Sequence, residues 1–298
     1  FEGMKKSMIV KSSYGTMNEN VSGDYINNSR NCVEVFESFD CEDVKYSNNL
    51  EVKVKNSMDH SYWGSNSSEI YECQACGYDI YNLKFCNLCW SNCADLSYCD
   101  HCFSTKNCFG CVGLKQKQYC ILNKQYSMQE YEVMVTRIIE HMKKTGEWGE
   151  FFPIQLSAFA YNESLANEWF PLSKEEALNR GYKWHEDDKE NNYKGPDIDM
   201  KDNIVDVADE ISKQILKCES SGKLYKIIPQ ELDFYRKMNL PIPRKCPDQR
   251  HLDRMKRRRP RQLWQRNCEK CGDNLESSYA PECPEKIYCD KCYLLEIN

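Results

Sequence analysis

A repeat of 26 residues constrains the fold of this chain more than any other feature. Three segments that begin at Cys41, Ser67 and Cys93 align at that spacing. A repeat this short cannot bury its own apolar face, and stacking several copies builds a continuous core. The columns of the alignment include an acidic one and an apolar one, formed by Asp43, Glu69 and Asp95 and by Val44, Ile70 and Leu96. The repeat therefore predicts a β-solenoid.

Within the repeat, short stretches such as Leu50/Val52/Val54 alternate in the way that strands do, and Asn, Ser, Asp and Gly separate them as turns require. We expect a mainly β chain in which residues 24–123 form solenoid coils of about 26 residues. Residues 1–23 are expected to be an N-terminal tail or a truncated start. The acidic column is expected at solvated turns, with a bound cation as the alternative.

Cysteine accounts for 19 of the 298 residues, and the cysteines fall in two groups, Cys32 to Cys120 and Cys218 to Cys292. An odd number prevents complete pairing within one chain, and secreted disulfide scaffolds are usually far shorter. We therefore expect a reducing compartment, either the cytoplasm or a particle assembled there.

The cysteines of the repeat have three interpretations. The 26-residue register places Cys73 over Cys99 and Cys76 over Cys102, which favours ladders of packed thiols because buried cysteine behaves as a small apolar residue. Paired C-x-x-C motifs also bind zinc or another thiophilic metal, and disulfides are the third interpretation. The metal interpretation would use Cys73, Cys76, Cys86, Cys89, Cys99, Cys102, Cys108 and Cys111.

Residues 124–217 are expected to be a helical connector. Ser127 and Glu130 form a capping box, apolar residues then recur at helical spacing, and Gly146 ends the pattern. This helix is expected to cap the open end of the last coil, as solenoids require. Residues 185–210 follow as an acidic linker of net charge −7, from ten Asp/Glu and three Lys, and a short helix is expected across Val205–Leu216.

The C-terminal residues 267–298 carry the strongest metal signal. Two C-x-x-C pairs, Cys268/Cys271 and Cys289/Cys292, are separated by seventeen residues, which is the spacing of a zinc ribbon. Each pair directs two thiolates at one ion, and four thiolates leave no open coordination position. The predicted zinc is therefore structural.

A second ribbon-like pattern covers residues 218–266. It contains Cys218, then Glu231-Leu-Asp-Phe-Tyr235, then Pro243-Arg-Lys-Cys246. This resembles the "probable zinc-ribbon" family, which implies a ribbon whose second and fourth ligands are here Ser221 and Gln249. More broadly, Asn107-Cys-Phe-Gly-Cys-Val-Gly-Leu-Lys115 and the C-terminal tail resemble uncharacterised cysteine-rich proteins of metagenomic bacteria and viruses, and that resemblance implies no activity.

Charge is concentrated in the same region. Residues 236–266 hold twelve Lys/Arg and two Asp, a net +10 in a chain of net charge −6. A basic stripe beside a zinc ribbon indicates phosphate binding, RNA or DNA, and an aromatic residue there can stack on a base. The alternative is docking on the acidic linker or on the acidic column. The predicted nucleic-acid ligands are Arg254, Lys256, Arg257, Arg258, Arg259, Arg261 and Trp264.

The sequence contains none of the common catalytic motifs, including the nucleophile elbow, the phosphate-binding loops and H-E-x-x-H. It also lacks an apolar run of the roughly 18 residues that span a membrane. The first hypothesis is therefore a non-enzymatic, zinc-stabilised binding protein that contacts nucleic acid. The second is a building block that self-associates into an assembly through the solenoid's N-terminal edge. The third is a metal-dependent enzyme that uses the N-terminal cysteines.

Overall fold

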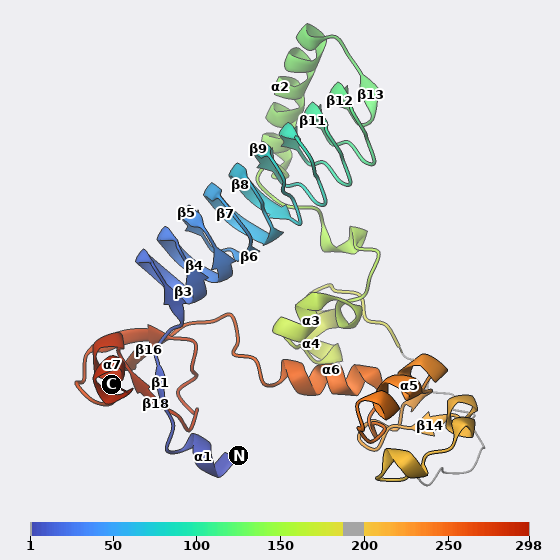
Figure 1. The fold of residues 1–298 in the computed structure, drawn as a ribbon. Coiled ribbons are helices and arrows are strands. Elements are labelled where there is room, and N and C mark those ends of the chain that lie inside the picture. Colours follow the sequence, from blue (N-terminus) through green and yellow to red (C-terminus); the bar gives the residue numbers. More distant parts are fainter. Residues whose placement is uncertain (1, 187–199, 298) are drawn as a thin grey trace. The chain divides into compact units, whose positions relative to one another are not determined.

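A computed structural model describes residues 2–186 and 200–297, and its largest element is a parallel β-solenoid (Figure 1). The predicted mainly β solenoid is confirmed. Successive partners along one side are Glu19, Arg30, Glu42, Lys55, Ser68, Tyr81, Ala94, Lys106 and Gln118, which makes eight steps. Its strands are β2 (Gly15–Thr16), β3 (Glu19–Asn27), β4 (Arg30–Phe39), β5 (Cys41–Lys45), β6 (Asn48–Leu50), β7 (Val54–Trp63), β8 (Ser67–Gln74), β9 (Ile80–Lys84), β10 (Ala94–Ser97), β11 (Lys106–Phe109) and β12 (Gln118–Ile121), and antiparallel β13 (Lys124–Gln125) closes the sheet.

One coil contains 12 or 13 residues over most of the solenoid, so the 26-residue repeat spans two coils and the predicted coil length is wrong. Leu83, for example, pairs with Ile70 on one side and Leu96 on the other. The doubled period comes from the acidic column, in which amides alternate with acids. The column reads Asn31, Asp43, Asn56, Glu69, Asn82, Asp95 and Asn107.

This alternation has an electrostatic reason. Neighbouring strands lie about 4.8 Å apart, and carboxylates at that distance repel one another. An intervening amide donates a hydrogen bond instead: Asn31 Nδ2 to Asp43 Oδ1 at 3.0 Å, and Asn82 Nδ2 to Asp95 Oδ1 at 2.7 Å. An acid therefore recurs on every second coil.

Within a coil, about every third residue points inward. Cys32, Val35, Ser38 and Cys41 are successive inward residues, and each is at most 2% exposed. The residue before an inward position commonly has a left-handed backbone, as at Asp40 (φ 59°). Asn and Asp adopt this conformation more readily than most residues. The many Asn and Asp residues of the repeat thus allow the left-handed backbone at the corners, where the chain turns within each coil.

The cysteines of the solenoid stack in ladders, as the packing interpretation expects. All twelve are buried, and their Sγ atoms contact backbone carbonyls, as Cys89 Sγ does at 3.5 Å from both Asn87 O and Cys99 O. Because a coil has 13 residues here, Cys86 lies between Cys73 and Cys99. The two longest ladders are Cys73, Cys86, Cys99, Cys111 and Cys76, Cys89, Cys102.

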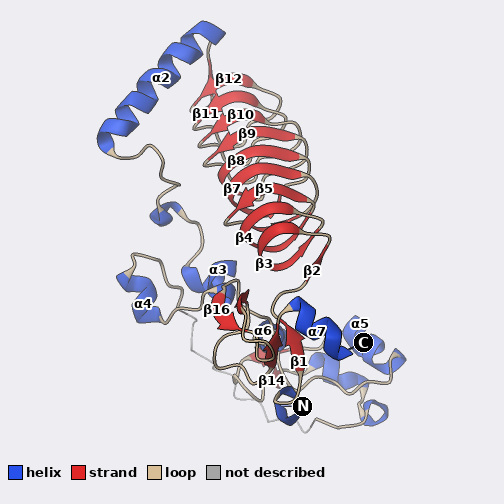
Figure 2. Ribbon diagram, turned by 90° about the vertical axis from the view of Figure 1, so that its left-hand side faces the viewer, coloured by secondary structure: helices blue, strands red, loops and turns tan. Residues whose placement is uncertain are grey.

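Helix α2 (Met128–Thr145) begins at the predicted capping box of Ser127 and ends at Gly146, whose φ is 76°. Its expected place over the open end of the last coil is wrong. The helix packs against a strip of apolar side chains on the outside of successive coils, and Figure 2 shows it beside the stacked strands. A helix along the side can cover this strip, which consists of Phe85, Tyr98, Phe109 and Ile121.

The chain forms two compact units, residues 1–156 with 260–298, and residues 157–259. The second unit packs a small core around Leu216, Ile227 and Leu232. The predicted helix across Val205–Leu216 is instead two 3-10 turns and a strand. The elements of this unit are η2 (Tyr161–Glu163), α3 (Leu165–Trp169), α4 (Lys174–Asn179), η3 (Ile204–Asp206), η4 (Asp209–Lys213), β14 (Leu216–Lys217), β15 (Leu224–Tyr225), α5 (Pro229–Lys237) and α6 (Pro247–Met255). The predicted acidic linker lies partly outside the described residues, which omit 187–199.

In the first unit the C-terminal ribbon meets the N-terminus, so the prediction that residues 1–23 form a tail is wrong. Strand β1 (Ile9–Lys11) pairs in parallel with β18 (Lys286–Tyr288) and is preceded by α1 (Glu2–Lys5). Ser278 Oγ donates to the buried carboxylate of Asp24, at the first coil. The ribbon and the solenoid thus belong to the same compact unit.

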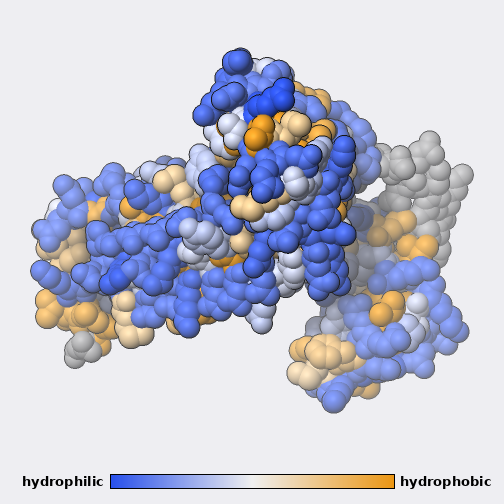
Figure 3. Space-filling view, turned by 90° about the horizontal axis from the view of Figure 1, so that it is seen from above, coloured by the Kyte–Doolittle hydropathy of each residue, from blue (hydrophilic) through white to orange (hydrophobic). Residues whose placement is uncertain are grey.

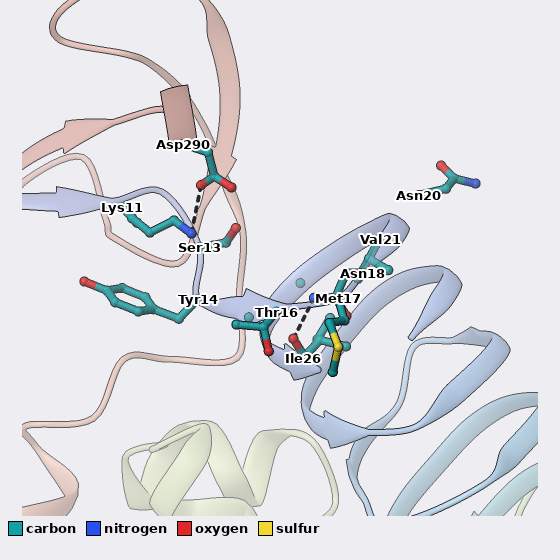
Figure 4. Close-up of a pocket in the computed structure, with 12 residues that line it drawn as sticks. Lys11, Ser13, Tyr14, Thr16, Met17, Asn18, Asn20, Val21, Ile26 and Asp290 are labelled. Atoms are coloured by element: carbon teal, nitrogen blue, oxygen red, sulfur yellow. Dashed lines mark hydrogen bonds and ion pairs between the residues drawn. The ribbon is translucent and has the colours of Figure 1, made fainter. Parts of the chain in front are cut away.

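A pocket of about 350 Å³ lies at this junction (Figure 4). Lys11 Nζ and Asp290 form an ion pair of 3.2 Å on one side of it, and Asn18 Nδ2 donates to Ile26 O at 2.6 Å on the other. The face of the molecule seen in Figure 3 is largely hydrophilic. Of the helices in the described ranges, none has the length and apolarity needed to cross a bilayer.

Candidate metal centre and basic surface

The four predicted zinc ligands lie together. The ligand atoms of Cys268, Cys271, Cys289 and Cys292 are all within 4.8 Å of one another. Across residues 2–186 and 200–297, this is the one group of three or more Cys, His, Asp or Glu side chains that meets this limit. The first pair lies in the turn between β16 (Trp264–Asn267) and β17 (Asn274–Ser277), and the second pair brackets the start of α7 (Asp290–Ile297).

Backbone N–H groups prepare this site for thiolates. Burial alone would raise the pKa of Cys268, but the N–H groups of Cys271, Cys289 and Lys270 outweigh it and lower the pKa to about 6. The hydrogen bond from Cys289 N to Cys268 Sγ is 3.3 Å long. Metal-binding thiols must lose their protons, so N–H donors aimed at sulfur favour metal binding.

Four thiols at this spacing suit a tetrahedral ion of the zinc type, and they leave no open coordination position for a substrate. The donor set therefore fits a structural metal. Cys283, which the spacing does not require, lies outside the group. Its Sγ is 3.8 Å from Arg266 Nη1, while that arginine also donates to Ala280 O at 2.6 Å.

The region of Cys218 repeats the backbone of this centre. In each ribbon the first cysteine, Cys218 or Cys268, donates its N–H to the carbonyl five residues later (2.9 and 2.8 Å). A glycine four residues after that cysteine donates back to its carbonyl (2.9 and 2.8 Å). The next residue also makes an equivalent bond in both ribbons. Glu219 N donates to Arg244 O at 3.1 Å, and Glu269 N donates to Ile287 O at 2.9 Å. Each of these carbonyls lies two residues before the third ligand position, which is Cys246 or Cys289. The two segments are therefore the same ribbon fold.

The side chains differ at two positions of this second ribbon. Ser221 stands where the first ribbon has Cys271, and Gln249 stands where it has Cys292. Cys246 begins α6 as its N-cap, and its Sγ accepts the N–H of Gln249 at 3.4 Å. Burial raises the pKa of Cys218, but Ser221 and neighbouring N–H groups lower it to about 6 overall. The backbone groups that favour a thiolate are therefore retained, although two of the four ligand positions no longer hold cysteine.

The N-terminal cysteines do not gather around a point in the way that the C-terminal four do. Adjacent C-x-x-C pairs occupy successive coils, so their thiols extend along the solenoid axis. The register also places one histidine among them, which the sequence analysis gave no role. His60 is fully buried, pairs with Cys73 on the next coil, and its Nε2 lies 3.0 Å from Cys76 O. Its inward position follows from the three-residue spacing.

Several cations of the predicted basic stripe form ion pairs within the protein, as expected if the stripe docks on the acidic linker. Arg244 pairs with Asp202 at 2.7 Å, and Arg236 with Asp209 at 2.5 Å, both in the acidic linker. Arg250 contacts Glu231 at 3.4 Å. These contacts lie within the second compact unit.

Arg261, one of the predicted phosphate ligands, is a docking residue. Its side chain is only 7% exposed and lies against the solenoid. Its Nε donates to Glu37 Oε2 at 3.1 Å, its Nη1 donates to Asn48 Oδ1 at 2.8 Å, and its guanidinium lies over the ring of Tyr62. Glu37 is a corner residue outside the predicted acidic column.

Four of the predicted cations remain exposed, and three of them form no ion pair with a described carboxylate. Arg254, Lys256 and Arg257 lie at the end of α6 and just beyond it, and no described carboxylate forms an ion pair with them. Arg258 is exposed and lies 4.7 Å from the centre of the Trp169 ring, while Arg259 is half-buried. Trp264 is half-buried in β16, in the other compact unit.

Comparison with known proteins adds no assignment: no family model matches the chain, and no curated protein matches it.

Proposed function

We propose that the chain is a non-enzymatic binding protein in which zinc stabilises the C-terminal ribbon and a local basic surface binds nucleic acid. The basic surface consists of Arg254, Lys256 and Arg257. The observation that carries the proposal is that no carboxylate within residues 2–186 and 200–297 forms an ion pair with these three cations, in a segment where other cations have such pairs.

Helix stability accounts for only part of this arrangement. A cation in the last turn of a helix interacts favourably with the carbonyl end, typically by a few tenths of a kcal/mol to about 1 kcal/mol. Arg254 gains that contact in α6. Lys256 and Arg257 extend the charge past the helix, where like charges repel one another unless an anion is present. A phosphate backbone supplies such anions at regular spacing.

The proposal is tested by a salt titration of binding to short fluorescent oligonucleotides. Three phosphate contacts predict a slope of log K against log salt of about −2 for single strands and about −3 for duplex DNA. Single-stranded RNA, single-stranded DNA and duplex DNA are compared at equal length, which also determines which nucleic acid is preferred. Affinity that is independent of salt contradicts the proposal.

The test variant is R254Q/K256Q/R257Q, and its matched control is R137Q/K143Q/K144Q. The control removes the same charge from α2, where these three residues are exposed and two of them lie in the last turn. We expect the first variant to lose most of the affinity and most of the salt slope, and the control to retain both. Equal losses in the two variants would mean that only net charge matters, and would overturn the assignment of the surface.

A further inference from the structure

One pair of cysteines has no part in the metal centre or in the basic surface. Cys218 and Cys246 occupy the first and third ligand positions of the second ribbon, where Ser221 and Gln249 fill the other two. A zinc-type ion bound there would have two thiolates where structural zinc sites have four N or S ligands. The ribbon backbone nevertheless holds both sulfur atoms at their ligand positions.

We propose that Cys218 and Cys246 form a redox-active dithiol that low-molecular-weight disulfides oxidise to an intramolecular disulfide. The equivalent sulfur atoms of the other ribbon, on Cys268 and Cys289, lie within 4.8 Å of each other. The second ribbon repeats the backbone hydrogen bonds of the first, with Glu219 N donating to Arg244 O at 3.1 Å as Glu269 N donates to Ile287 O at 2.9 Å, so its first and third ligand positions also face each other. Side-chain rotation from such a separation can reach the S–S bond length of about 2.05 Å.

The two sulfurs have different roles in this reaction. Cys218 lies in the turn that Ser220 and Ser221 form, and the nearby backbone N–H groups of this turn and of Cys246 favour its thiolate, the form that attacks disulfides. Cys246 Sγ lies at the N-terminus of α6, where a developing negative charge is also stabilised. Cys218 is therefore the attacking residue and Cys246 the resolving one.

Access is through an exposed turn. Both cysteines are 2% exposed, but Ser221 is exposed and its Oγ lies 3.8 Å from Cys246 Sγ. The thiols thus lie one residue beneath the surface, at a depth that favours a small oxidant.

The reaction balances without any further reactant. The Cys218 thiolate attacks one sulfur of a disulfide R–S–S–R, forming a mixed disulfide and expelling R–S⁻. Cys246 transfers its proton to solvent and attacks the Cys218 sulfur, expelling the second R–S⁻. Two electrons pass from the protein thiols to the reagent, one S–S bond breaks and one forms, and the two released thiolates take up the two protein protons.

The experiment uses the full chain, loaded with zinc, in buffers of increasing oxidised to reduced glutathione. Thiols are then alkylated, and disulfide-linked peptides are identified by mass spectrometry. We expect one dominant link, between Cys218 and Cys246, that appears at moderate ratios and disappears when the ratio is reversed. Full alkylation of both cysteines at every ratio, or links from Cys218 predominantly to other cysteines, would overturn the proposal. So would a second equivalent of zinc in the wild-type chain.

Cys218→Ser and Cys246→Ser provide the matched test. The fold already accepts serine at the neighbouring ligand position, and circular dichroism checks that each variant is folded. In each variant we expect the link to vanish, and in Cys246→Ser we expect a glutathione adduct on Cys218. Cys283→Ser, which changes a cysteine outside both ligand sets, should leave the link unchanged. A glutathione adduct on Cys246 in the Cys218→Ser variant that forms as fast as the adduct on Cys218 in the Cys246→Ser variant would contradict the assignment of the attacking and resolving residues.

Discussion

Ser221 Oγ lies 3.8 Å from Cys246 Sγ, and Cys271 Sγ lies at the same distance from Cys289 Sγ in the C-terminal ribbon. The two ribbons therefore share a ligand geometry and differ in ligand chemistry. A hydroxyl replaces a thiol at an equivalent place, and the backbone hydrogen bonds around it are retained.

This equivalence predicts that two substitutions restore a lost metal site. In the variant S221C/Q249C, we expect zinc content to rise from one to two ions per chain, because four thiols would again surround one point. Elemental analysis under reducing conditions measures this directly. The single variant S221C is the control, since three thiols should bind the second ion more weakly. Retention of a single zinc by the double variant would refute the equivalence.

Removal of the metal should loosen the N-terminus before it loosens the solenoid. Strand β1 pairs with β18, which directly precedes Cys289 and Cys292, and structural metal binding contributes directly to folding. After chelation we expect amide hydrogen exchange of residues 9–11 to accelerate about tenfold or more, while the interior positions Leu83 and Leu96 stay protected. An equal loss of protection along the whole chain would contradict this coupling.

The docking contact of Arg261 should contribute measurably to stability. R261Q removes the hydrogen bonds to Glu37 and Asn48 and the ion pair between the guanidinium and the Glu37 carboxylate. We expect the free energy of unfolding to fall by about 1–3 kcal/mol. R254Q, at an exposed position, should change it by less than about 0.5 kcal/mol. A cycle with E37Q isolates the pair, and an additive result would show that the two side chains do not interact.

His60 predicts acid sensitivity of the solenoid. Burial, partly offset by the carbonyl of Cys76, lowers the pKa of His60 from 6.5 to about 4. Between these values the unfolded chain binds a proton that the folded chain does not, so the contribution of His60 is complete above pH 6.5 and is lost as the pH falls. The loss approaches about 3 kcal/mol near pH 4. Urea unfolding of wild type and H60Q across this range, with H141Q as the exposed control, measures it, and parallel wild-type and H60Q curves would exclude this role.

The alternating column predicts a charge effect of its own. N82D places a carboxylate between Glu69 and Asp95 and removes the amide that donates to Asp95. We expect a loss of about 1 kcal/mol or more in unfolding free energy at neutral pH, with partial recovery at pH 4 as carboxylates are protonated. D95N is the control, because it adds no charge. Equal stability of N82D and wild type would mean that the alternation has no electrostatic role.

The sequence supported the β-solenoid and the C-terminal ligands for physical reasons. A column of like side chains at a fixed spacing, such as Val44, Ile70 and Leu96, reports stacking directly, because every coil must bury its own inward positions. Two C-x-x-C turns determine which thiols can reach one ion, since each turn holds its two cysteines close together. Both signals are local or periodic in the chain.

Sequence reasoning identified the period but gave the wrong coil length, because the acids repeat over two coils while the inward residues repeat over one. The three-residue spacing of inward positions, which also places His60 in the core, was present in the sequence and was obscured by varied side chains such as Cys, Ser, Val and Leu.

The pairing of distant segments was decided by the tertiary structure. Nothing local in the sequence indicates that β1 joins β18, that Arg261 contacts Glu37, or that α2 covers the side of the coils. These contacts depend on which buried surfaces and charges meet once the chain has folded. Sequence alone determined the repeating unit and the metal ligands. The tertiary structure decided which cations form ion pairs and which remain exposed, because an ion pair requires proximity in space and not in sequence.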